Sequence, residues 1–400
     1  MARFSDDTLL GRDASEEGED DLTVGPSEAL LTGSDWTVGT LLGQLRTRRI
    51  ELNPNFQRRE AWDLRRKSKF IESLLLNLPI PQIVLAERRD RRGSYLVIDG
   101  KQRLLALWRF GAGANNSDDD IEPLRLTGLD IRKDLNGKTW ADLEDDAELV
   151  AAVEFLENQT IRTVVIKNWP DADLLHLVFH RLNTGSVTLS PQELRQALHP
   201  GPFVTWADEA SASSKGLARL LGNSGPDFRM RDVELLIRYF AFTFFLGDYR
   251  GNLKKFLDDA CDHLNKRWNR DEDSIREELS RLDRAIEGTF VVFGDDAFMR
   301  WGGSDYEGRF NRAVFDIMVY YFKDPAVVRS AVRRKAAVRR AFQNLCDDNR
   351  AFVQSIQTTT KTALATHTRL SEWGHALEQV LNIDLPVPSL EGDRVKRIVP

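Results

Sequence analysis

The chain has 400 residues, of which 42% are hydrophobic and 30% charged, with a formal net charge of -6. This composition allows a large core divided among two or three structural units. The acidic balance excludes a protein that coats nucleic acid indiscriminately, but it permits local basic surfaces. No stretch reaches the roughly 18–20 apolar residues that cross a bilayer, and the N-terminus has no apolar run with a cleavage site. We therefore expect a cytoplasmic protein without a membrane partner.

Residues 1–33 are predicted to be a flexible acidic tail. They contain the run EEGEDD at residues 16–21 and little that a core could bury. Ordered structure is expected to begin near Ser34, where a polar pair precedes Leu41, Leu42 and Leu45 at helical spacing.

Residues 34–171 are predicted to form an α+β domain. Phe70, Ile71, Leu74 and Leu75 recur at the helical period, and this helix must stop before the prolines at 79 and 81. Strands are expected at 82–86, 94–98 and 160–166, helices at 104–110 and 140–157, and short strands with turns at 124–139. The segment 111–120 has no periodic apolar face and predicts a surface loop.

The strand expected at 94–98 runs into a polar turn, Asp99-Gly100-Lys101-Gln102-Arg103, and a helical apolar pattern follows at once. A buried strand fixes the place of such a turn, and glycine permits a conformation or a close approach that a side chain would block. The N-terminus of the following helix offers unpaired N–H groups to an anion. The pattern therefore predicts a phosphate-binding turn.

Helical patterns dominate residues 172–400 and predict an all-α C-terminal domain. One helix is expected to stop at Asn183-Thr-Gly185, with glycine in the left-handed conformation. Ser190-Pro191-Gln192-Glu193 then combines an N-cap, a proline at the first helical position and a glutamate at the third. Further helices are expected at 233–245, 252–266, 273–290, 310–322, 325–345 and 369–381.

Residue types that bind metals are sparse. Cys261 and Cys346 lie far apart in expected helices, which favours reduced, packed thiols over a disulfide or a zinc site. His176 and His180 have the spacing of a metal pair, but no glutamate follows the first and no third ligand is evident. A packed or solvated helix face is the better interpretation of these histidines.

The densest positive cluster lies between residues 329 and 340. Its members are Arg329, Arg333, Arg334, Lys335, Arg339 and Arg340. Such a cluster is typical of a solvated helix face, and equally of a surface that follows a phosphate backbone. The sequence leaves both interpretations open.

Several motifs occur in a fixed order: Phe56-Gln57-Arg58 with Trp62, IESLLLNLPIP at 71–81, IDGKQR at 98–103, and FHRLNTG at 179–185 with LSPQEL at 189–194. In this combination the chain resembles the N-terminal domain family of Gmr-type (GmrSD) modification-dependent restriction enzymes, over roughly residues 36–260. The resemblance implies a ParB/sulfiredoxin-like core for residues 34–171 and a role in prokaryotic phage defence.

The resemblance also implies a ligand. Members of the family bind, and in some cases hydrolyse, nucleoside triphosphates through a turn usually written Asp-Gly-Gln-Gln-Arg. Lys101 replaces the first glutamine here, whereas Asp99, Gly100, Gln102 and Arg103 match. Lys101 and Arg103 would neutralise phosphate charge, Gln102 would orient a water or a phosphate oxygen, and Asp99 would hold Mg²⁺ or accept a proton. The extra cation favours phosphate binding and leaves hydrolysis open.

Two further segments complete the expected pocket. Gln57 and Arg58 would close it from the opposite loop, and Asn183 would contribute an amide from a third segment. The aromatic rings of Phe56 and Trp62 fit core anchors better than platforms for base stacking.

Larger relatives carry a C-terminal HNH-type nuclease domain, but no compact His–Asn–His arrangement and no Walker-type loop occurs in this sequence. The preferred hypothesis is a nucleotide-binding, DNA-sensing component of a restriction-type defence system that acts with a separate effector or nuclease. Two alternatives stay open: a metal-dependent DNA nickase with Asp99 and Glu60 as ligands, and a non-catalytic DNA-binding adaptor working through residues 329–340. The nucleotide, the DNA modification, the partner and the oligomeric state cannot be read from the sequence.

Overall fold

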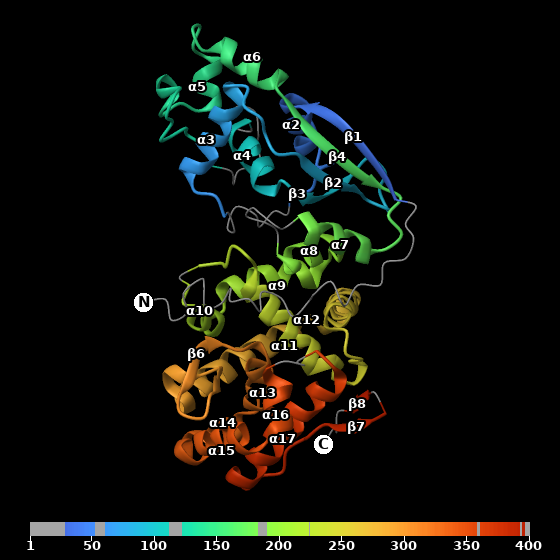
Figure 1. Cartoon of the computed structure of the whole chain (residues 1–400), viewed down its shortest axis with the longest axis vertical. Coiled ribbons are helices and arrows are strands. Elements are labelled where there is room, and N and C mark those ends of the chain that lie inside the picture. Colours follow the sequence, from blue (N-terminus) through green and yellow to red (C-terminus); the bar gives the residue numbers. More distant parts are fainter. Residues whose placement is uncertain are drawn as a thin grey trace. The chain divides into compact units, whose positions relative to one another are not determined.

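The computed structural model describes residues 29–52, 61–111, 122–182, 190–223, 225–357, 361–392 and 394–396. They form two compact units, one within Leu22–Leu198 and one within His199–Pro400 (Figure 1). Residues 1–28 of the predicted tail and most of the predicted 111–120 loop lie outside the described residues.

The N-terminal unit is built on a four-stranded mixed sheet with the order β1-β4-β2-β3. Its strands are β1 (Leu30–Thr37), β2 (Ile83–Glu87), β3 (Tyr95–Asp99) and β4 (Thr160–Lys167). The β4–β2 pair is parallel, and the two outer pairs are antiparallel. The three predicted strands are confirmed, but the start near Ser34 is wrong because Ser34 already lies within β1. This edge strand exposes most of its side chains, so it lacks the apolar alternation that would reveal it.

Helices cover both faces of the sheet (Figure 1). On one face, Ile83 and Leu85 of β2 contribute to a core with α2 (Val38–Arg46), α3 (Leu64–Leu75), α4 (Lys101–Gly111), α5 (Trp140–Glu144) and α6 (Val150–Asn158). On the other face, Val84 and Ala86 contribute to a smaller core with α7 (Ala172–Leu182) and α8 (Pro191–Leu198). Successive strand residues thus supply opposite layers, as the period of two requires.

The compact unit runs beyond the predicted boundary at residue 171. Phe179 of α7 and Leu194 of α8 are buried in the same cluster as Leu96 and Ile98 of β3. Both helices therefore group with the sheet, and the division between the units falls after Leu198.

Residues 124–157 differ from the sequence expectation. The single helix predicted at 140–157 is two helices, α5 and α6, and the described residues 124–139 contain a short 3₁₀ turn, Lys133–Leu135, but no strand. The buried carboxylate of Glu72 on α3 instead accepts hydrogen bonds from the backbone N–H groups of Ile131 and Arg132, both at 2.8 Å. A side chain thus satisfies backbone donors that a strand would have paired.

The C-terminal unit is largely helical, which confirms the predicted fold class. Its helices are α9 (Pro202–Ser213), α10 (Lys215–Leu221), α11 (Arg231–Phe245), α12 (Leu253–Phe293), α13 (Arg312–Phe322), α14 (Pro325–Arg333), α15 (Lys335–Asp348), α16 (Arg350–Gln357) and α17 (Ala363–Leu381). Short ribbons add β5 (Met299–Trp301) with β6 (Tyr306–Phe310), and β7 (Ser389–Glu391) with β8 (Arg394–Lys396).

Two predicted helices at 252–266 and 273–290 are one helix, α12, of 41 residues. The intervening polar residues contain no glycine or proline, and the ion pair between Arg267 and Asp271 at 2.6 Å joins side chains one turn apart. Conversely, the helix predicted at 325–345 is divided at Arg334 into α14 and α15.

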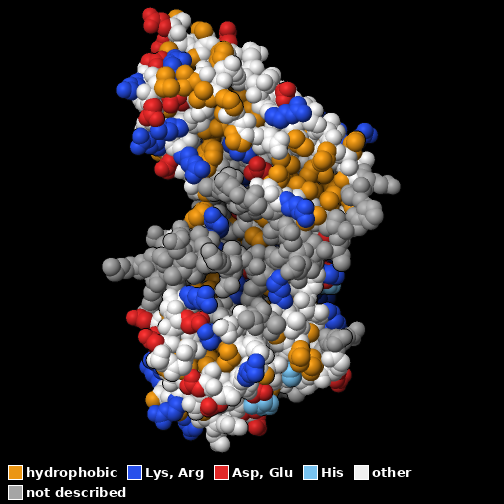
Figure 2. All heavy atoms as spheres, in the orientation of Figure 1, with side chains coloured by type: hydrophobic (Ala, Val, Ile, Leu, Met, Phe, Trp, Pro, Cys, Tyr) orange, Lys and Arg blue, Asp and Glu red, His pale blue; other side chains and the backbone are white. Residues whose placement is uncertain are grey.

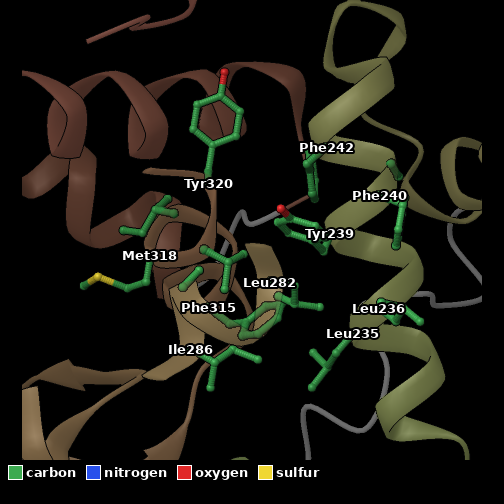
Figure 3. Close-up of a cluster of buried hydrophobic side chains, with 14 of the residues drawn as sticks. Leu235, Leu236, Tyr239, Phe240, Phe242, Leu282, Ile286, Phe315, Met318 and Tyr320 are labelled. Carbon is green, nitrogen blue, oxygen red and sulfur yellow. The ribbon is translucent and has the colours of Figure 1, made fainter. Parts of the chain in front are cut away.

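The core of this unit lies between α11, α12 and α13. Leu236 and Tyr239 of α11, Ile286 of α12 and Phe315 of α13 belong to one buried cluster (Figure 3). Among the described residues, no helix is both long enough and apolar enough to cross a membrane. Cys261 and Cys346 form no disulfide. Burial raises the pKa of Cys346 to about 12, which keeps this thiol protonated at neutral pH.

Candidate functional site

The predicted phosphate-binding turn lies where β3 ends and α4 begins. Ile98 is buried under α7 and α8, so the end of the strand is fixed. Gly100 has a φ of +95°, which L-residues with side chains rarely adopt. A Cβ atom on Gly100 would lie 3.0 Å from Ile83 Cγ1 and 3.3 Å from Arg103 Nε. Glycine is therefore needed here both for the backbone conformation and for the close packing of the turn.

Arg103 folds back over this turn and pairs with its first residue. Its Nη2 donates to Asp99 Oδ2 at 2.8 Å and to the carbonyl oxygen of Gln82 at 3.0 Å. The residue is 8% exposed, and its Nε is buried without a hydrogen-bond partner among the described residues. Arg103 thus keeps a donor for a further acceptor, such as a phosphate oxygen.

Asp99 is less buried than its partner. Its side chain is 28% exposed. While Oδ2 is held by Arg103, Oδ1 accepts no bond from the described residues. Mg²⁺ in nucleotide sites is commonly bound by one or two carboxylates together with phosphate oxygens. The free oxygen of Asp99 fits that role, although it is a single ligand.

Gln102 links the turn to the chain that follows residues 53–60. Its Oε1 accepts a hydrogen bond from the backbone N–H of Trp62 at 3.3 Å. The Trp62 ring packs edge-on against Phe70 of α3, with ring centroids 5.8 Å apart, and Arg66 lies over its face. These contacts support the interpretation of Trp62 as a packing residue.

Lys101 forms an ion pair with Glu193, a residue that the sequence predicted only as part of a helix cap. Its Nζ donates to Glu193 Oε1 on α8, and both side chains are about 5% exposed. The other carboxylate oxygen of Glu193 accepts from the Ser190 N–H at 2.6 Å, while Ser190 Oγ accepts from the Glu193 N–H at 3.1 Å. The predicted start of α8 is therefore confirmed, with an additional ion pair to the turn.

Within the turn, Arg103 bonds to Asp99, whereas Lys101 bonds to Glu193 and Gln102 bonds to Trp62. Gln57, Arg58 and Asn183, together with Phe56 and Glu60, lie outside the described residues. After the first of these segments, Trp62 bonds to Gln102 of the turn. After the second, Ser190 bonds to Glu193, the residue that pairs with Lys101. The contribution of the outer segments stays a prediction.

The part of the chain that contains this turn matches a known protein family. Residues 38–200 match the family described as GmrSD restriction endonuclease, N-terminal domain. This segment is a GmrSD-type N-terminal domain. The family points to a restriction-type defence protein. No curated protein and no solved structure matches the chain.

The predicted basic cluster lies outside the GmrSD-type domain, on α14 and α15. Arg339 pairs with Asp296 at 2.5 Å, and Arg334 donates to the carbonyl oxygen of Val380, also at 2.5 Å. Of this cluster, Arg329, Arg333, Lys335 and Arg340 are exposed and have neither a carboxylate nor a carbonyl partner among the described residues. On the face drawn in Figure 2, Lys and Arg side chains lie at the edge of the C-terminal unit where Figure 1 places α14 and α15.

Of the predicted histidine pair, the side chain of His180 lies outside the described residues. His176 is 1% exposed within α7 of the GmrSD-type domain. Within the described ranges, no group of three or more His, Cys, Asp or Glu side chains is placed to hold a metal ion.

Proposed function

We propose that the protein binds a nucleoside triphosphate with Mg²⁺ at the turn after β3, senses DNA through its C-terminal unit and signals to a separate effector in a prokaryotic defence system against phage. The observation that carries the nucleotide part is Arg103, a buried guanidinium in the first turn of α4 whose Nε has no hydrogen-bond partner among the described residues. A helix N-terminus and a guanidinium are both strong donors to phosphate. The family match supports the defence role.

Three residues of the turn have distinct parts in this proposal. Arg103 and the first N–H groups of α4 bind phosphate oxygens. Asp99 holds Mg²⁺, which would neutralise phosphate charge when bound. Gln102 and Asp99 are the residues that would orient or deprotonate a water if the nucleotide is hydrolysed. We propose binding ahead of hydrolysis, because Asp99 Oδ2 and Gln102 Oε1 are already held by neighbours.

A panel of nucleoside triphosphates tests the proposal directly. With Mg²⁺, we expect at least one to raise the melting temperature of the purified protein, because a ligand that binds only the folded state stabilises it. Asp99→Ala and Arg103→Ala should weaken binding roughly tenfold to a hundredfold, as loss of a charged hydrogen bond does. Arg88→Ala is the matched control, because Arg88 is mostly buried and pairs with Glu51 at 3.0 Å away from the turn. Binding unchanged by both turn substitutions would refute the proposed site, and phosphate release measures hydrolysis separately.

The DNA part rests on the exposed cations of α14 and α15. Because they lie at the surface without carboxylate partners among the described residues, their charge is available to a phosphate backbone. Charge reversal of Arg329, Arg333 and Arg340 should abolish the retardation of DNA in a native gel. Retardation by the reversed protein equal to that of the wild type would refute this surface.

A further inference from the structure

The buried Lys101–Glu193 pair joins two segments that are distant in sequence. Lys101 opens α4 and Glu193 lies in the first turn of α8. Their side chains are 5% and 6% exposed. A lone charge at this depth would carry a large desolvation penalty, which contact with the opposite charge offsets. The two residues therefore depend on each other.

Glu193 is satisfied on both oxygens. One accepts from Lys101 Nζ, and the other accepts from the backbone N–H of Ser190. The same carboxylate thus completes the cap of α8 and neutralises the ammonium of the turn. A phosphate placed on Lys101 would bring a second negative charge close to Glu193, and like charges at such short range repel.

Arg103 differs from Lys101 in this respect. Its partner Asp99 is 28% exposed, and its Nε stays unsatisfied among the described residues. The two cations of one turn therefore have different capacities for a ligand. Arg103 has a donor to offer, whereas the charge of Lys101 is compensated from within the unit.

We infer that Lys101 is a positioning residue that acts through Glu193, rather than a phosphate ligand. The pair holds the turn against the start of α8, and so against Ser190, the first described residue after the segment that carries Asn183. Glu193 thereby becomes part of the nucleotide site without touching the nucleotide. This inference rests on the proposed nucleotide binding.

A double-mutant cycle separates the two roles. Lys101→Met, Glu193→Gln and the double variant are compared with the wild type by nucleotide affinity and by the melting temperature without ligand. Methionine keeps most of the lysine volume, and glutamine retains the capping oxygen for Ser190. Each single variant should lower the melting temperature by about 10 °C, because it removes one half of a buried ion pair. Each should also weaken nucleotide binding roughly tenfold through misplacement of the turn.

The double variant gives the decisive result. With neither charge present, we expect the affinity to return to within about threefold of the wild type, because the two losses are coupled. If Lys101 contacts phosphate, the double variant will bind as weakly as Lys101→Met, and Glu193→Gln will bind at least as well as the wild type. That pattern would overturn the inference and leave nucleotide binding intact. A wild-type chain that binds no nucleotide overturns the proposed function and this inference together.

A matched pair in the other unit controls for general destabilisation. Lys254 and Asp258 of α12 are paired at 3.1 Å, with side chains 7% and 8% exposed. Lys254→Met should lower the melting temperature without changing nucleotide affinity, because the pair lies in the C-terminal unit. A comparable loss of affinity in this variant would mean that Lys101→Met acts by loss of folded protein alone, which would overturn the inference.

Discussion

The turn at residues 99–103 and the basic surface on α14 and α15 use the same side-chain types in opposite surroundings. Lys101 and Arg103 are buried and each pairs with a carboxylate at a defined atom. Arg329, Arg333 and Arg340 are exposed and have no such partner in the described part of the chain. A buried cation depends on its own partner, so single substitutions there should have large, specific effects. Exposed cations act through their summed field, so single substitutions should have small and salt-dependent effects.

Of the substitutions that compare the two regions, Gly100→Ala in the turn is expected to change the free energy of unfolding most. The added Cβ atom meets Ile83 and Arg103 in a left-handed backbone conformation, so we expect a loss of about 2–3 kcal/mol in the free energy of unfolding. Chemical denaturation measures this loss. Gly137→Ala is the control, because Gly137 also has a positive φ, of +82°, but a Cβ atom there would have no neighbour within 4 Å. Equal losses in the two variants would show that backbone conformation alone, and not packing of Arg103 over the turn, makes glycine necessary.

A smaller effect is expected from Gln102→Met. The substitution removes the acceptor of the Trp62 N–H, so it should cost about 1 kcal/mol of stability. It should also weaken nucleotide binding, because Gln57 and Arg58, which are predicted to bind the nucleotide, precede Trp62 closely in the sequence. Asn136→Leu is the control, since Asn136 Oδ1 likewise accepts from a backbone N–H, that of Leu129 at 3.1 Å, away from the turn. If both variants lose stability but neither loses affinity, Gln102 only holds Trp62.

The two regions also differ in how much the sequence could predict. The strand, the glycine and the helix of the turn follow one another along the chain, so local pattern was enough to locate them. The capping role of Glu193 was visible for the same reason. Its ion pair with Lys101 spans 92 positions, and no local pattern reports such a contact. Lys101 itself could have indicated this ion pair. It replaces a neutral glutamine between a buried strand and an apolar helix, and a buried cation requires a counter-charge.

Errors in the helical region have a similar cause. Residues 267–272 were left out of the two predicted helices, but they contain no glycine or proline that would end a helix, and α12 runs through them. The break at Arg334 was missed because residues on both sides favour helix and no proline or glycine marks the division. β1 was missed because an exposed edge strand carries little periodic signal.

The smallest single effects are expected on the basic surface. Changing Arg329, Arg333 or Arg340 to Gln one at a time should leave the free energy of unfolding within about 0.5 kcal/mol of the wild type, because exposed side chains contribute little to stability. Each change should lower the slope of log affinity for DNA against log salt concentration by about 0.9, if that side chain neutralises one phosphate. Measuring DNA affinity at several salt concentrations gives this slope.

Lys255, Arg270 and Arg281 provide the matched control for that series. They are also exposed, but each pairs with a neighbouring carboxylate on α12. Their replacement by Gln should leave the slope unchanged, because a paired charge displaces few counterions from DNA. Similar slope changes in both series would show that DNA responds to the overall charge of the unit. A change confined to α14 and α15 would instead locate the contact there, because each substitution that lowers the slope removes one phosphate contact.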